Sequence, residues 1–149
     1  MSPHPITDLS IRDATPADAD AIVAILNPII EARIYTVFDA PFSVETERDH
    51  ITRFPVRGIW KVAVREGDRR LVGFQVMEPF GQYTRAFDHV GTLGTYVDLD
   101  LRRRISLFEL TRQNDVDVIA RQHEAANAFH VVHADGHSFH ARLDQRRRS

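Results

Sequence analysis

The sequence of 149 residues contains no cysteine, which excludes disulfide bonds, thiolate metal ligands and thiol catalysis. Long apolar runs are also absent. The longest run, from Ala21 to Ile30, is interrupted by Asn27 and Pro28 and is far shorter than the roughly 18 to 20 apolar residues that span a bilayer. The first eight residues show neither the basic start nor the apolar stretch of a secretory signal. We therefore expect a cytoplasmic protein with no membrane partner.

The chain also lacks an excess of charge of either sign. Its 19 basic and 21 acidic residues give a net charge of −2, which is too balanced for a general polyanion binder, so we do not expect nucleic acid as a partner. Residues 1–100 hold ten basic and fifteen acidic groups (net −5), whereas residues 101–149 hold nine and six (net +3) and five of the eight histidines. The length predicts one domain, 1–149, whose last third differs chemically from the rest.

The N-terminal third predicts a short strand at 10–12 followed by a helix. The helix is expected to begin at Thr15-Pro16-Ala17-Asp18, because a hydroxyl cap, a proline and an acid are typical of a first turn. Pro28 should kink this helix or end it early. Residues three and four apart predict its buried face, which consists of Ile22, Ile25, Leu26, Ile29 and Ile30.

A second helix and a hairpin are expected next. The helix should begin at Ser43 and stop at Pro55, with Val44, Ile51 and Phe54 turned inward. Residues 60–65 and 71–77 then alternate between apolar and polar on either side of a Glu-Gly-Asp turn, which predicts an antiparallel hairpin. Beyond it we expect a strand at 90–97, a helix at 105–123 and a last strand at 128–133.

Several separate segments, in this order, resemble the phosphinothricin acetyltransferase-like branch of the GNAT acetyltransferase superfamily. They are Ile11–Asp18, Asn27–Glu31, Leu71–Phe74 and Gly94–Asp98. The likeness is strongest over residues 9–104. It implies an α/β (α+β) fold in which a mixed, mostly antiparallel sheet is flanked by helices. It also implies acetyl-CoA as the donor co-substrate and the amine of a small molecule or amino acid as the acceptor, acetylated by direct attack on the thioester.

The resemblance also implies a backbone site for the cofactor arm. Main-chain groups of Thr95, Tyr96 and Val97 would pair with pantetheine and polarise the thioester carbonyl. Such a site depends on strand geometry, so it leaves few marks in the side chains.

The phosphate-binding loop departs from the family pattern. The family uses R/Q-x-x-G-x-G/A, whose amides cradle the diphosphate. Here Arg102, Arg103 and Arg104 are followed directly by Ile105 and Ser106, so the glycines are absent. A β-branched residue resists the conformations that bring backbone close to phosphate. We expect the three arginines to hold the diphosphate by charge, together with Ser106, and the alternative is a solvated basic helix start.

Amine acetylation also needs a base that removes a proton from the substrate ammonium. In the resembled branch a glutamate on the fourth strand lies near the acetyl group, and Thr92 occupies the matching position. Glu78, Asp88 and His89 are the catalytic candidates, because they lie where the strands of the sheet are expected to part. Ordinary surface solvation is the alternative for each of them.

The C-terminal segment raises two further expectations. The family would continue into a closing hairpin of two more strands, so we expect its C-terminal strands to be missing. An uncovered sheet edge exposes unpaired backbone groups, and a homodimer that covers this edge would satisfy them. The alternative function is therefore a degenerate, non-catalytic scaffold that acts as a binding or oligomerising module.

The same segment contains four closely spaced histidines, which are a candidate metal site by spacing alone. If residues 128–133 form a strand, the first two point to opposite faces of the sheet. We expect no metal site from this group, which consists of His130, His133, His137 and His140.

Overall fold

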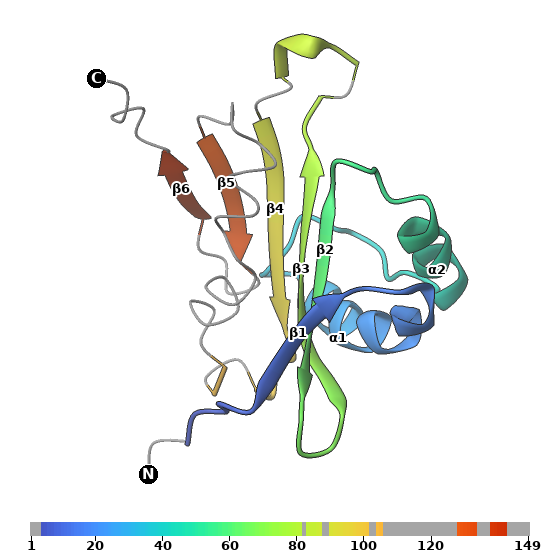
Figure 1. Cartoon of the computed structure of the whole chain (residues 1–149), viewed down its shortest axis with the longest axis vertical. Helices are drawn as coiled ribbons and strands as arrows, with labels where there is room; N and C mark the ends of the chain where they lie inside the picture. Colours follow the sequence, from blue (N-terminus) through green and yellow to red (C-terminus); the bar gives the residue numbers. More distant parts are fainter. Residues whose placement is uncertain are drawn as a thin grey trace.

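In the computed structural model, six strands form one sheet, and two helices pack on one of its faces (Figure 1). The structure describes residues 4–81, 83–87, 90–101, 104–105, 128–133 and 138–142. The elements are β1 (Leu9–Asp13), α1 (Ala19–Glu31), α2 (Val44–Thr52), β2 (Ile59–Arg65), β3 (Arg70–Pro79), β4 (Val90–Val97), β5 (Ala128–His133) and β6 (Ser138–Arg142).

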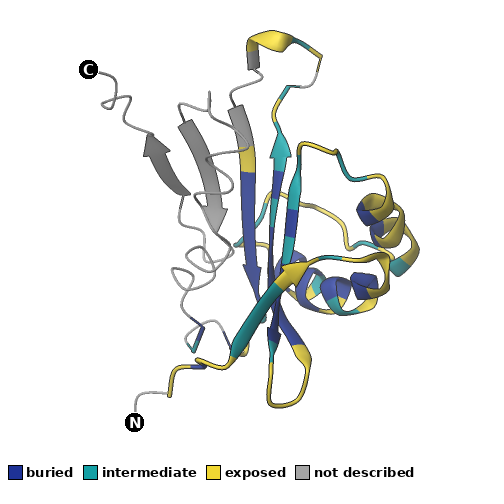
Figure 2. Ribbon diagram, in the orientation of Figure 1, coloured by how far each residue is buried: buried dark blue, intermediate teal, exposed yellow. Residues whose placement is uncertain are grey.

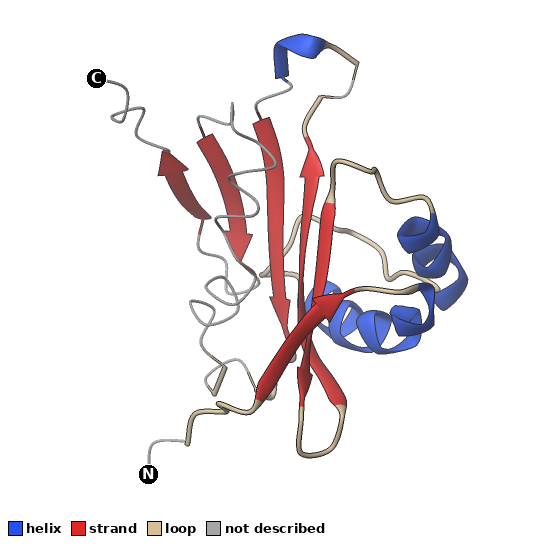
Figure 3. Cartoon of the chain, viewed as in Figure 1, coloured by secondary structure: helices blue, strands red, loops and turns tan. Residues whose placement is uncertain are grey.

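The strands lie in chain order, β1 to β6, and β4 pairs with β5 in parallel while every other neighbouring pair is antiparallel (Figure 3). The expectation of a mixed, mostly antiparallel sheet is therefore confirmed. The expectation that residues 128–133 form the last strand is wrong, because β6 follows and pairs with β5 in the register His130↔His140. The sequence of β6, Ser138-Phe139-His140-Ala141-Arg142, alternates between polar and apolar residues, and this alternation was a signal for the strand. The helix expected at 105–123 lies almost wholly outside the described residues.

The start of the first helix is held by Asp18. Its carboxylate accepts hydrogen bonds from the Thr15 backbone N–H at 2.8 Å and from the Arg12 guanidinium at 2.7 and 2.8 Å. The Arg12 hydrogen bonds hold the pKa of Asp18 below its usual range. The predicted helix start is thus confirmed, as a single 3-10 turn, Pro16–Asp18, that leads into α1.

α1 buries the five isoleucines and leucines that the spacing predicted. Pro28 does not stop the helix, which continues to Glu31. Next to the proline, the Asn27 side chain both donates to the Phe42 carbonyl and accepts from the Phe42 backbone N–H, each at 2.9 Å. This clamp and the burial of Ile29 and Ile30 hold the last turn in place.

α2 begins where predicted, because the Ser43 hydroxyl accepts a hydrogen bond from the Thr46 backbone N–H at 3.1 Å. Ile51 is buried against α1 and the sheet, and the helix ends before Pro55. α2 also buries Glu47, which is 2% exposed.

Each face of the sheet carries its own apolar cluster. Buried residues concentrate in the central strands and in α1 (Figure 2). The helix-face core joins α1 and Ile51 of α2 to alternate residues of the central strands, among them Val62, Phe74 and Tyr96. The opposite-face core contains Ile6, Ala63, Val72, Val97, Leu101 and Ile105. Within the part of the chain that the structure describes, no helix combines the length and apolar character needed to cross a membrane.

Candidate functional site

Alternate residues of β4 serve the two faces of the sheet, as strand geometry requires. Tyr96 joins the helix-face core, whereas Val97 joins the opposite-face core. Thr95 is fully buried, and its hydroxyl oxygen accepts a hydrogen bond from the Gln75 side-chain amide of β3 at 2.9 Å. The three residues expected to contact the cofactor arm are therefore held rigidly in the middle of the molecule.

The end of β4 extends beyond its ladder with β5, whose last pair is Thr95↔His133. The Asp98 N–H donates to the Val72 carbonyl on the β3 side. Because backbone groups alternate along a strand, the Val97 N–H and carbonyl face the opposite, β5 side. This arrangement can offer main-chain hydrogen bonds to an extended ligand that lies along β4.

Tyr96 lies flat along the helix face of its own strand. A Cβ atom added to Gly94 would be 2.9 Å from the ring Cε2 and 3.0 Å from the hydroxyl oxygen, so only glycine permits this position. Burial raises the pKa of the hydroxyl, and the nearby carboxylates of Glu47 and Glu78 raise it further, while a hydrogen bond with Thr36 opposes them. The phenol is therefore neutral at physiological pH and can donate or accept a hydrogen bond.

Glu78, one of the predicted bases, is the last residue but one of β3 and contacts α2. Its carboxylate Oε1 is 3.0 Å from His50 Nε2, and the Nδ1 of the same imidazole is 3.8 Å from Glu47 Oε2. Glu47 and Glu78 raise the pKa of His50 to about 9, so the imidazole is a cation at neutral pH. A cationic His50 carries a proton on both ring nitrogens, so it cannot act as a base at neutral pH.

Sequence reasoning missed Glu47 and His50. Both lie on α2, and Glu47 falls three residues after Val44 and four before Ile51, which places it on the face predicted to point inward. An acidic residue on the apolar face of a helix was the signal that could have identified it. His50 lies one helical turn further on and so reaches the same region.

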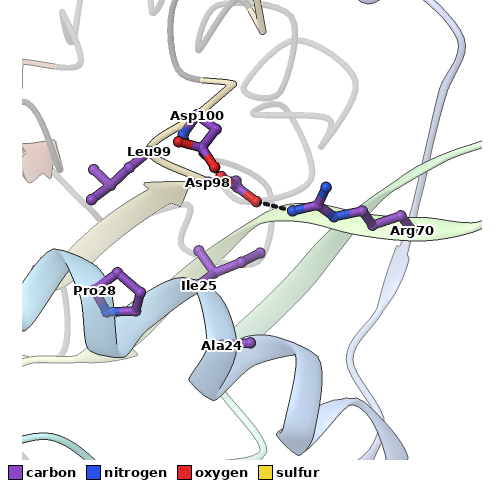
Figure 4. A pocket seen from close by; sticks show the side chains of 7 residues that line it. All are labelled: Ala24, Ile25, Pro28, Arg70, Asp98, Leu99 and Asp100. Atoms are coloured by element: carbon purple, nitrogen blue, oxygen red, sulfur yellow. Dashed lines mark hydrogen bonds and ion pairs between the residues drawn. The ribbon is translucent and has the colours of Figure 1, made fainter.

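The turn after β4 is built around Asp98 (Figure 4). One carboxylate oxygen forms an ion pair with Arg70 at the start of β3, and the other accepts from the Asp100 N–H at 2.9 Å. Beside this pair lies a pocket of about 260 Å³, lined on its other side by Ala24, Ile25 and Pro28 of α1. The ion pair fixes the direction in which the chain leaves β4 toward the arginines.

Beyond this turn, the backbone at Arg104 and Ile105 is already hydrogen-bonded. Both N–H groups donate to the Leu101 carbonyl, at 2.8 and 3.1 Å, and the Arg104 carbonyl accepts from the Ile6 N–H at 2.8 Å. The Ile105 side chain is 3% exposed and belongs to the opposite-face core. These two residues therefore offer no amide cradle for a diphosphate.

The remaining predicted site residues lie outside the described residues: Arg102, Arg103, Ser106, Asp88 and His89. The register of β5 and β6 sets His130 opposite His140 in the backbone, and His137 also lies outside the described residues. Where the structure describes the chain, no group of three histidine, aspartate or glutamate side chains could hold a metal ion.

Of the comparisons with known proteins, only the one with solved structures finds similar proteins. No protein-family model matches the chain, and no curated protein matches it. A crystal structure assigned provisionally as a phosphinothricin N-acetyltransferase is similar, with a TM-score of 0.69 and 20% identity over 83% of this chain and 72% of that one.

Two further solved structures agree. A GCN5-related N-acetyltransferase from Kribbella flavida has a TM-score of 0.66 and 25% identity over 83% of this chain and 70% of that one. The other is a GNAT superfamily phosphinothricin acetyltransferase from Sinorhizobium meliloti, solved in complex with acetyl-CoA. It has a TM-score of 0.66 and 15% identity over 84% of this chain and 65% of that one. The chain therefore has the fold of the GNAT acetyltransferases, as its sequence motifs predicted.

Proposed function

We propose that the chain is an N-acetyltransferase that transfers the acetyl group of acetyl-CoA to the amine of a small molecule. The observation that carries this proposal is the end of β4, where Val97 turns its N–H and carbonyl to the β5 side beyond the last pair of the ladder. In this fold such an edge suits the extended, amide-bearing pantetheine arm. Thr95 and Tyr96 hold the strand rigid by burial on both faces.

The proposed reaction needs the amine in its neutral form. A substrate ammonium first loses one proton to a carboxylate, for which Glu78 is the described candidate, and Asp88 and His89 are the others. The nitrogen lone pair then attacks the thioester carbon, a C–N bond forms and the C–S bond breaks. The second proton passes from nitrogen to the departing thiolate, which gives an amide and free CoA. Backbone amides at the end of β4 would stabilise the carbonyl oxygen as charge develops on it.

The residues present suit the two parts of acetyl-CoA unequally. The β4 edge fits the pantetheine arm. At Arg104 and Ile105 the amides are taken by Leu101, so they do not fit a diphosphate. We therefore expect the phosphates to be held by the side chains of Arg102 to Arg104 and Ser106, with weaker and less oriented binding than a glycine loop gives.

The N–H groups of Arg104 and Ile105, which already donate to the Leu101 carbonyl, also favour a second candidate function. It is a non-catalytic scaffold that acts as a binding or oligomerising module. β6 ends the described sheet, so a homodimer paired at that strand would fit this role. Gel filtration of the full chain distinguishes a monomer from a homodimer, and a monomer at micromolar concentration contradicts the dimer.

Calorimetric titration with acetyl-CoA, followed by an assay of thiol release with an amine panel, tests the enzyme. The chain has no cysteine, so a thiol reagent reports only free CoA. We expect micromolar binding that weakens by at least about tenfold in Arg104→Ala, because one cation–phosphate contact is worth about 1.5 to 3 kcal/mol. Arg53→Ala, at the end of α2, is the matched control and should bind normally. Absence of binding at millimolar acetyl-CoA overturns the proposal and leaves the scaffold.

A further inference from the structure

A compact group of polar and aromatic side chains lies between α2 and the helix face of β2, β3 and β4. We call it the α2 cluster, and it consists of Glu47, His50, Trp60, Glu78 and Tyr96. Its polar members are joined through the His50 imidazole, which contacts Glu78 at 3.0 Å and Glu47 at 3.8 Å. Two carboxylates around one imidazolium leave the cluster with a net negative charge.

The aromatic members form one wall of the α2 cluster. The rings of His50 and Trp60 meet edge to face with centroids 5.0 Å apart. Phe74 links Trp60 to Tyr96: its ring is tilted against Trp60, with centroids 6.3 Å apart, and stacks on Tyr96 at 4.8 Å. Trp60 is 6% exposed, and its indole Nε1–H has no hydrogen-bond acceptor among the described residues. A buried donor without an acceptor costs free energy. An ammonium has no lone pair to accept this bond, so the N–H itself does not select an amine, and the indole contributes through its apolar face.

The α2 cluster is open to solvent on one side. The side chains of His50 and Glu78 are 46% and 43% exposed, whereas Glu47 is buried behind them. A ligand can therefore approach Glu78 directly, and the buried carboxylate adds to the negative potential there. The cluster also shares Tyr96 with the strand edge at which we place the pantetheine arm.

The charges at the α2 cluster indicate what kind of ligand it selects. The charged groups that act on His50 are Glu47 and Glu78, and the same two carboxylates act on Tyr96. A ligand ammonium would be attracted to these carboxylates and to the aromatic faces beside them. A ligand carboxylate in the same place would be repelled, because like charges brought together cost several kcal/mol.

We propose that the α2 cluster binds the ammonium group of the acceptor, and that it selects simple aliphatic amines or diamines over amino acids that carry a carboxylate beside the amine. This inference rests on the proposed acetyl transfer for its role, but amine binding itself needs no acetyl-CoA. Glu78 contacts the ammonium directly, Glu47 supplies charge from behind, and the indole and phenol line the aliphatic side.

Trp60 is the only tryptophan in the chain, so its fluorescence reports on the α2 cluster without labelling. The full chain is titrated at pH 7, without acetyl-CoA, with pentylamine, 1,4-diaminobutane, norleucine and 1-pentanol. Norleucine is pentylamine with a carboxylate added on the carbon that bears the amine, and 1-pentanol lacks the positive charge. We expect saturable changes with the two amines, affinity at least about tenfold weaker for norleucine, and no change with 1-pentanol.

Two variants assign the effect to residues. Glu78→Gln removes a half-exposed charge without opening the core and should weaken pentylamine binding about tenfold. Glu45→Gln, an exposed neighbour on α2, should bind pentylamine like the native chain. Far-UV circular dichroism checks that both variants fold.

Each outcome decides the inference separately from the enzyme proposal. Equal affinity for norleucine and pentylamine overturns the inference, as does a titration that shows neither a fluorescence change nor heat in calorimetry. If the amines bind with the expected order but free no CoA from acetyl-CoA, the enzyme proposal fails and the amine site stands. If acetylation occurs and norleucine is the better acceptor, the enzyme proposal stands and the selectivity fails.

Discussion

The two faces of the sheet differ in what they contain. The face beneath α1 and α2 combines a continuous apolar core with the titratable α2 cluster at its edge. The opposite face contains a smaller core that draws in Ile6 from the N-terminal segment and Ile105 from the turn after β4. One strand, β4, contributes to both faces. The comparison teaches that substitutions on the two faces can act separately, because adjacent residues of a single strand, Tyr96 and Val97, belong to different cores.

The largest expected effect tests which face carries more stability. Phe74→Ala removes a ring that is 2% exposed and stacks on Tyr96, and it should lower the free energy of unfolding by about 3 to 5 kcal/mol. On the opposite face, Ile105→Ala should cost about 2 kcal/mol, because the site is close to the chain's N-terminal segment and can partly collapse. Urea unfolding measures both. Equal losses of unfolding free energy in the two variants would show that the helix-face core does not contribute more stability than the opposite-face core.

A second test concerns the strand that both faces share. Gly94→Ala places a methyl group 2.9 Å from the Tyr96 ring, so the ring must move, and we expect a loss of about 2 kcal/mol in thermal or urea unfolding. In Gly67→Ala the new methyl group meets only Asp8 Oδ2, at 3.4 Å, and stability should change by less than about 0.5 kcal/mol. A Gly94→Ala protein as stable as the native chain would show that Tyr96 does not need its flat position.

A third test addresses the loop that brings Thr36 toward Tyr96. Asn27→Ala removes both hydrogen bonds to the Phe42 backbone and should cost about 1 to 2 kcal/mol. Asn27→Asp keeps the acceptor for the Phe42 N–H and loses the donor, so its loss should lie between those of Asn27→Ala and the native chain. If Asn27→Asp is the less stable of the two variants, the Phe42 N–H bond is not the stabilising one.

The smallest expected effect depends on pH. The folded pKa of His50 is raised to about 9 from 6.5, so its charge stabilises the fold fully below pH 6.5 and this contribution fades as the pH rises through 9. The difference in Tm between the native chain and His50→Asn should therefore be largest near pH 6 and smallest above pH 9.5. His4→Asn, at an exposed N-terminal position, is the control. A Tm difference that does not vary with pH would show that the His50 charge does not contribute to the stability of the fold.

Much of the fold was predictable because local signals and burial agree. The Thr15–Asp18 cap, the isoleucine spacing of α1 and the alternation of β2 and β3 each predicted the element that the structure shows. The α2 cluster was not predictable in the same way. Glu78 and His50 are 28 residues apart and meet only through tertiary packing, and no spacing rule links them.

The β4 edge illustrates a different limit. Thr95, Tyr96 and Val97 were predicted as cofactor contacts only through the family resemblance, because main-chain hydrogen bonding is independent of side-chain type. The sequence did show that glycine is absent after Arg104. It could not show that the amides of Arg104 and Ile105 would turn back to Leu101, since that choice depends on how Ile105 is buried.

The pairing of β1 has a consequence for how the chain is made. Leu9 pairs with Arg65, and the Ile6 N–H reaches the carbonyl of Arg104. During synthesis from the N-terminus, β1 therefore has no native partner until β2 has left the ribosome. The hydrogen bond from the Ile6 N–H can form only after Arg104 has also emerged. β1 therefore stays unpaired while α1 and α2 are made, and an unpaired strand can pair with other chains in the meantime.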